Sequence, residues 1–119
     1  MSNKKELIIE ITRDVFFDKG KEKINYSYSG RFEEGSTFSN AKKYLNGILV
    51  PLSSEEALLD NLKPALITHY NLSQNIIFDI KVSFINRRGA VWYTSKDSPE
   101  DAKRIESILK KDLEGILFN

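Results

Sequence analysis

The residues best suited to chemistry lie in one short segment near position 90. Arg87 and Arg88 belong to the run Asn86-Arg87-Arg88-Gly89, and Trp92 and Tyr93 follow closely. Guanidinium groups bind carboxylates and phosphates through paired hydrogen bonds, and aromatic rings offer flat surfaces on which a base or a peptide can stack. These four residues form the predicted partner-binding site. The alternative is an ordinary solvated turn, with Trp92 covered by a helix.

The other groups that often do chemistry predict neither a catalytic residue nor a set of metal ligands. His69 is the only histidine, and the chain has no cysteine that could share a metal ion with it. The acidic pairs at 33–34, 55–56 and 100–101 fall at turns or at the start of expected helices, where capping and the helix dipole account for them. The sequence contains no phosphate-binding glycine loop and no nucleophile motif. We therefore expect no catalytic residue, no metal and no cofactor.

Length and composition predict one domain over residues 1–119. Hydrophobic residues make up 40% of the chain and charged residues 29%, which is enough apolar material for one core. The 18 lysines and arginines nearly balance the 17 acids, so the net charge of +1 creates no overall field toward nucleic acid or an anionic membrane. The apolar run 7–9 is too short for a signal peptide, and no segment approaches the ~20 apolar residues of a membrane span. The expected location is cytoplasmic, with no membrane contact.

The first half of the chain predicts a hairpin followed by a helix. Apolar residues alternate with polar ones over 6–17 and again over 24–32, around a charged turn, and this alternation places Tyr26 and Tyr28 on the core side. Between 38 and 50 two patterns compete. Asn46-Gly47 is a common two-residue hairpin turn, whereas five apolar residues with helical spacing predict an amphipathic helix. We prefer the helix because the first strand of that hairpin would be very short; its apolar residues are Ala41, Tyr44, Leu45, Ile48 and Leu49.

The second half predicts a helix, a hairpin and a final helix. Ser53 and Glu56 form a capping box that starts a helix, which Pro64 either kinks or divides. Strands at 76–85 and 90–94 flank a turn at 86–89, and Ser98-Pro99 begins a helix that runs toward the C-terminus. The expected architecture is α+β, with two antiparallel hairpins in one four-stranded sheet, three helices on its apolar face and the order ββααββα.

These features favour a binding function over catalysis. We expect a non-enzymatic protein-binding module, of the immunity or inhibitor type found in bacteria and phages, that contacts its partner through the 86–93 hairpin and a sheet edge. One alternative is nucleic-acid binding through Arg87 and Arg88. Another is a small-ligand sensor or minor enzyme built on Asp79, Lys81 and His69. An exposed edge strand would also allow a homodimer.

Overall fold

A long hairpin forms the centre of the fold in the computed structural model, which describes residues 5–32, 35, 37–73, 78–89 and 94–114. The elements are β1 (Lys5–Asp18), β2 (Lys21–Phe32), β3 (Thr37–Asn40), β4 (Lys42–Leu45), β5 (Ile48–Pro51), α1 (Glu55–Ser73), β6 (Phe78–Arg88), β7 (Thr94–Asp97) and α2 (Pro99–Asp112). The antiparallel pairing of β1 with β2 confirms the predicted hairpin. Its turn is the dipeptide Lys19-Gly20, with positive φ angles of 52° and 78°, as the tight turns of twisted hairpins require.

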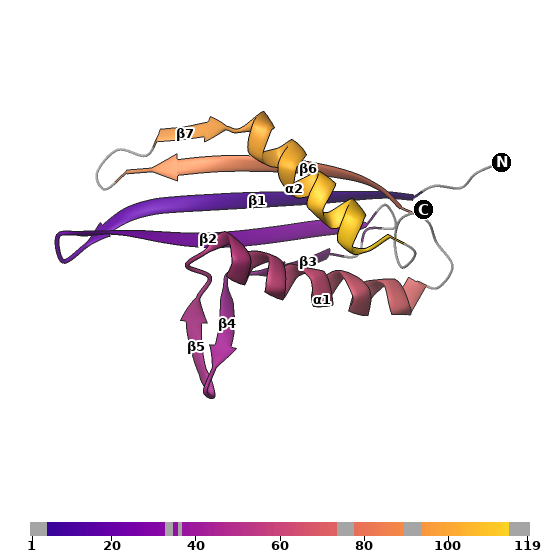
Figure 1. Cartoon of the computed structure of the whole chain (residues 1–119), viewed down its shortest axis with the longest axis horizontal. Coiled ribbons are helices and arrows are strands. Elements are labelled where there is room, and N and C mark those ends of the chain that lie inside the picture. Colours follow the sequence, from indigo (N-terminus) through magenta and orange to yellow (C-terminus); the bar gives the residue numbers. More distant parts are fainter. Residues whose placement is uncertain (1–4, 33–34, 36, 74–77, 90–93, 115–119) are drawn as a thin grey trace.

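The sheet has five strands in the order β3-β2-β1-β6-β7, and its central pair, β1 and β6, is parallel (Figure 1). A separate two-stranded sheet contains β4 and β5, and the described residues form two helices. The prediction of a four-stranded sheet with three helices is therefore wrong, although the α+β class is correct. The parallel pair was missed because local periodicity identifies a strand but carries no information about which distant strand it pairs with.

The segment from 37 to 51 forms three short strands instead of the predicted helix. Asn46 and Gly47 have φ angles of 52° and 79°, so they form the hairpin turn between β4 and β5. The helix would have placed Gly47 in its interior, at a cost of about 1 kcal/mol relative to alanine. β3 instead pairs with β2 and extends the main sheet by one strand.

Both helices differ slightly from the prediction at their ends. The cap of α1 is Ser54, whose hydroxyl oxygen accepts a hydrogen bond from the Ala57 N–H at 3.1 Å, so the predicted cap at Ser53 is wrong by one residue. α1 continues through Pro64 as one helix. α2 begins at Pro99 after Ser98, as predicted, but it ends at Asp112, so the prediction that this helix continues to the C-terminus is wrong. The residues beyond Glu114 lie outside the described ranges.

The second hairpin is longer than predicted. β6 continues to Arg88, and its register with β7 pairs Arg88 with Thr94. The turn predicted at 86–89 is therefore wrong, because β6 has taken in residues assigned to that turn. Of the strand predicted at 90–94, residues 90–93 lie outside the described residues, and Thr94 begins β7. Trp92 and Tyr93 lie outside the described residues.

The core lies between one face of the sheet and the two helices, which lie on the same side of the sheet (Figure 1). Tyr26 and Tyr28 are buried there, as predicted, with only 6% and 5% of their surface exposed. The opposite face of the sheet is mostly polar and is covered by neither of the two described helices, which is typical of a sheet packed on one side. The fully buried side chains of the core are Leu7, Ile9, Ile11, Leu52, Leu58, Leu62, Leu66, Ile80, Phe84, Ile105 and Leu109.

The contact between Gly30 and Phe38 fixes β3 against β2. A β-carbon on Gly30 would lie 2.1 Å from the Phe38 ring, which also packs against Phe32 with ring centroids 5.8 Å apart. We expect Gly30→Ala to lower the free energy of unfolding by about 1–3 kcal/mol, because the ring must move out of its packed position. Urea denaturation measures this loss.

A double-mutant cycle provides the control. In a Phe38→Ala background the ring is gone, so Gly30→Ala should cost much less than it does in the wild type. An equal cost in both backgrounds would contradict this account of the contact.

Candidate interaction surface

Arg87 and Arg88 lie in β6 beside the long hairpin instead of at the tip of a turn. Arg87 Nε lies 3.7 Å from Asp14 Oδ1, and Arg88 Nη2 lies 3.5 Å from Glu22 Oε2. Asp14 belongs to β1 and Glu22 to β2, so the two arginines link β6 to both strands of the hairpin. The structure gives Arg87 and Arg88 a structural contact, while their predicted role in partner binding, with Trp92 and Tyr93, stays a prediction.

The residues suggested for a small-ligand site do not all come together. Lys81 Nζ lies 3.0 Å from Glu6 Oε2 on the exposed polar face, and this hydrogen bond raises the pKa of the Lys81 amine. His69 belongs to α1, which packs on the other face of the sheet. Within the described ranges, no group of three or more His, Cys, Asp or Glu side chains is placed to hold a metal ion.

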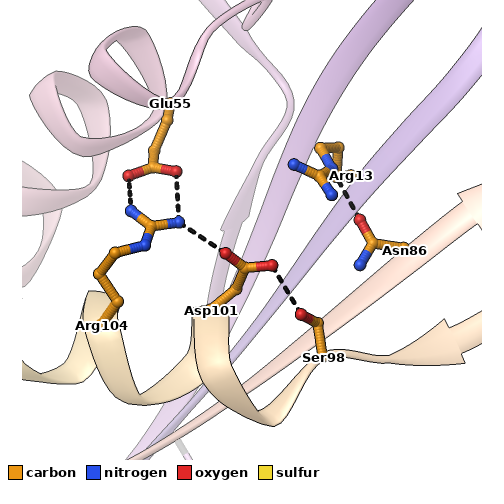
Figure 2. Close-up of polar contacts among 6 residues, drawn as sticks. All are labelled: Arg13, Glu55, Asn86, Ser98, Asp101 and Arg104. Carbon is orange, nitrogen blue, oxygen red and sulfur yellow. Dashed lines mark hydrogen bonds and ion pairs between the residues drawn. The ribbon is translucent and has the colours of Figure 1, made fainter.

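A charged cluster joins the N-terminal turns of the two helices (Figure 2). Arg104 of α2 makes a two-pronged ion pair with Glu55 of α1, in which Nη2 lies 2.8 Å from Oε2, and Nη2 also lies 2.8 Å from Asp101 Oδ1. The hydroxyl of Ser98 donates to Asp101 Oδ2 at 2.6 Å. Hydrogen bonds from Arg104 and then from Ser98 hold the pKa of Asp101 below its usual range. The cluster therefore orients the two helices on the sheet.

Arg13 marks the end of the apolar core on the helix side of the sheet. Its Nε donates to Asn86 Oδ1 at 2.6 Å (Figure 2), and its guanidinium carbon lies 5.6 Å from the centre of the Phe84 ring. Cations stack favourably on aromatic faces at this distance. Beyond Arg13, β1 and β2 continue as an arm, which we define as residues 14–25, and β6 flanks only its first two residues, Asp14 and Val15.

The apolar side of this arm becomes more exposed toward its tip. Tyr26, Ile24 and, across the hairpin, Phe17 lie on the same face of the two strands. Their exposed fractions rise from 6% at Tyr26 to 36% at Ile24 and 64% at Phe17. The apolar face of the sheet thus extends beyond the area that the helices cover.

The β4–β5 hairpin projects from the body of the protein and carries large apolar side chains in solvent (Figure 1). Tyr44 is paired with Leu49, and Leu45 with Ile48, across the two strands. Successive residues of a strand point to opposite faces, so both faces of this ribbon are apolar. The exposed fractions are 74% for Tyr44, 53% for Leu45, 66% for Ile48 and 52% for Leu49.

Sequence reasoning missed this hairpin as a surface because its apolar residues also fit the buried stripe of a helix. The symmetric arrangement of two apolar residues on each side of Asn46-Gly47 is the signal that could have identified it.

The polar face of the sheet has shallow hollows along β1, β2 and β3. Two of them have volumes of about 360 and 330 Å³ and share Glu10, Ser29 and Ser39 in their walls. Such volumes are at the small end of the range for ligand sites, which are also mostly apolar. The hollows are open and hydroxyl-lined, and they are a weaker candidate for binding than the exposed apolar hairpin.

Comparisons of the chain with family models, with curated proteins and with solved structures gave no match. In the part of the chain that the structure describes, no helix is long and apolar enough to cross a membrane. The candidate surface therefore rests on its own geometry: an apolar hairpin and an adjoining arm.

The charged cluster between the helices predicts a measurable pH effect. Arg104→Gln should lower the free energy of unfolding at pH 7 by about 0.5–1 kcal/mol, a modest loss because the guanidinium is nearly half exposed and screened by water. The folded state lowers the pKa of Asp101, so the stabilisation is present above the unfolded pKa of about 3.9 and is lost as the pH falls through the folded pKa.

Urea unfolding of wild type and variant between pH 7 and about pH 3 tests this expectation. The stability difference should narrow below about pH 4. Lys103→Gln removes an exposed cation from the same helix and should show no such narrowing. A difference for Arg104→Gln that stays constant across this range would rule out the assigned role of Asp101.

Proposed function

We propose that this chain is a non-enzymatic protein-binding module whose contact surface centres on the β4–β5 hairpin. The observation that supports the proposal is that Tyr44, Leu45, Ile48 and Leu49 are each more than half exposed on a projecting element. Clustered exposed apolar residues on a folded protein are typical of interaction sites, whereas isolated ones are ordinary. Tyrosine is also among the residues enriched at the energetic centres of protein interfaces.

The magnitudes indicate how much such a surface can contribute. Burying a large apolar side chain fully is worth roughly 1.5–3 kcal/mol, and these four are already partly covered. Association costs on the order of 4–15 kcal/mol in lost motion. The hairpin alone therefore supports weak binding, and a stable complex needs neighbouring surfaces as well.

The shape of the hairpin restricts the kind of partner. Because both faces of the ribbon are apolar, a flat partner would cover one face and leave the other in water. A cleft, or a segment that folds around the hairpin, buries both. The Asn46-Gly47 turn adopts its favoured conformation and holds the two strands in register, so little conformational entropy is lost on binding.

The other functions considered for this chain have less support. Binding of nucleic acid by Arg87 and Arg88 would compete with their ion pairs to Asp14 and Glu22. A ligand sensor built on Lys81 and His69 would have to join the polar face, which carries Lys81, to α1, which packs on the other face of the sheet. The immunity or inhibitor type of function remains compatible with a small module that presents one apolar hairpin.

Variants of the hairpin test the proposal directly. Tyr44→Ser/Ile48→Ser removes one large apolar group from each face of the ribbon, and since both groups are exposed, stability should change by less than about 1 kcal/mol. A partner captured by the wild-type chain from cell extract and then purified should bind this variant at least ~30-fold more weakly by calorimetry, as expected for a loss of about 2 kcal/mol.

Two further variants serve as controls. Phe16→Ser removes an exposed aromatic ring from the polar face of the arm and should leave partner affinity within about threefold of wild type. Arg87→Ala/Arg88→Ala tests the partner-binding site predicted from the sequence independently of the hairpin surface. If the hairpin variant bound the partner as tightly as wild type, the hairpin would not be the contact surface.

A further inference from the structure

One stretch of β2 has a free edge beside the β4–β5 hairpin. β3 pairs with β2 only from Tyr28 to Arg31, and the Tyr26 N–H donates to the Leu52 carbonyl at 2.7 Å. From Lys21 to Asn25, no other described strand pairs with β2 on that side. In Figure 1 this half of β2 runs from the base of the hairpin to the tip of the arm along the outer side of the sheet.

The backbone along this edge is oriented to accept another strand. Within an antiparallel ladder, alternate residues point their N–H and C=O groups toward the same neighbour. Since Tyr26 points its N–H away from β1, Glu22 and Ile24 point their backbone groups the same way. The free edge has five residues, or roughly 17 Å, which is the length of an ordinary strand.

The charges around the edge are mostly positive. Lys19, Lys21 and Lys23 lie on the arm, and Lys42 and Lys43 lie at the base of the hairpin. None of these five lysines takes part in an ion pair within the described ranges. Of the nearby acids, Asp14 and Glu22 already face Arg87 and Arg88, and Asp18 lies opposite Lys21, so the five lysines remain in excess. A negatively charged strand would therefore be attracted to this edge.

We propose that an acidic, extended protein segment binds here by adding to β2 as a further strand between Lys21 and Asn25, with the hairpin packing against its apolar side chains. This inference rests on the proposed protein-binding function and specifies the partner. Backbone pairing supplies affinity in this mode of recognition, and the flanking side chains select the sequence. A second copy of the same edge is a poor occupant, because like-charged lysines would face one another.

The exposed side chains beside the edge fit this partner. Ile24 lies on the helix side of β2 and is 36% exposed, while Lys21 and Lys23 lie on the opposite side. An added strand with alternating residues would place apolar side chains beside Ile24 and acidic ones beside the lysines. A bilayer offers no backbone groups to pair with Glu22 and Ile24, so the free edge favours a protein chain.

Synthetic peptides of roughly eight residues test the charge requirement, a length that spans the free edge. One peptide alternates glutamate and valine, and a matched peptide carries glutamine in place of glutamate. By fluorescence anisotropy, the glutamate peptide should bind at least about tenfold more tightly at low salt, and the difference should largely disappear near 1 M salt, where the screening length is about 3 Å.

Lys21→Glu/Lys23→Glu should remove the preference for the glutamate peptide. The matched control Lys96→Glu/Lys103→Glu makes the same change in charge on exposed lysines of β7 and α2 and should retain the preference. Equal binding of both peptides to the wild type would overturn the acidic partner and leave the hairpin proposal standing.

A proline variant tests the pairing mode. Ile24→Pro removes the outward N–H without removing a ladder bond to β1, because proline is tolerated where the N–H faces away from the sheet. It should weaken peptide binding at least about tenfold relative to Ile24→Ala, which removes the same apolar contact but keeps the N–H. Equal binding by these two variants would overturn strand addition. Folding of each variant is checked by circular dichroism.

Failure of both peptides to bind the wild-type chain would overturn the inference as a whole. Binding to phosphatidylserine vesicles in that case would identify an anionic membrane surface, and not an extended protein segment, as the occupant. Comparison of the hairpin variant Tyr44→Ser/Ile48→Ser with Ile24→Pro separates the two proposals. A partner that needs the hairpin but not the edge would lose affinity for the hairpin variant and bind Ile24→Pro normally.

Discussion

The parallel pairing of β1 with β6 joins the two halves of the chain, and the positions of the other elements follow from it. Eleven residues of each strand are in register, from Lys5 opposite Phe78 to Val15 opposite Arg88, so β1 is bonded along both of its edges. A parallel pair requires a crossover, and the chain between β2 and β6 supplies it with α1. α2 follows β7 and returns to the same face. One face of the sheet is therefore covered and the other is open.

The lengths of the strands explain where apolar surface remains exposed. β6 ends at Arg88, opposite Val15, whereas β1 and β2 continue together to their turn at Lys19-Gly20. The helices cover the sheet only as far as the region of Arg13 and Tyr26. Ile24 and Phe17 lie beyond that limit and keep the core-facing parity of the strand without a covering layer. The ion pairs of Arg87 and Arg88 stabilise the base of the arm, where packing by helices has ended.

Local patterns were sufficient where a single pattern applied, and they failed where two coincided. Only one local pattern applies around Tyr26 and Tyr28, which it places in the core, and only one applies at Ser98-Pro99, where it predicts the start of α2. The structure confirms both predictions. Around Asn46-Gly47, the spacing that forms a helical stripe also places apolar residues opposite one another across a two-residue turn. The choice depends on whether a tertiary surface buries the stripe, and no local pattern contains that information. Arg87 and Arg88 were assigned to a turn for a similar reason: the length of β6 is set by its pairing with β1, which is a distant contact.

The lysines near the arm and hairpin affect both self-association and the choice of a partner. An exposed strand edge and an apolar hairpin both favour self-association, and lysine on an edge strand is a common means of preventing it. Lys21 and Lys23 on β2, with Lys42 and Lys43 on the hairpin, place positive charge beside both surfaces. The same charges that repel a second copy attract a negatively charged chain. In the proposed strand addition, the charges that keep this surface from aggregating also select the charge of the partner.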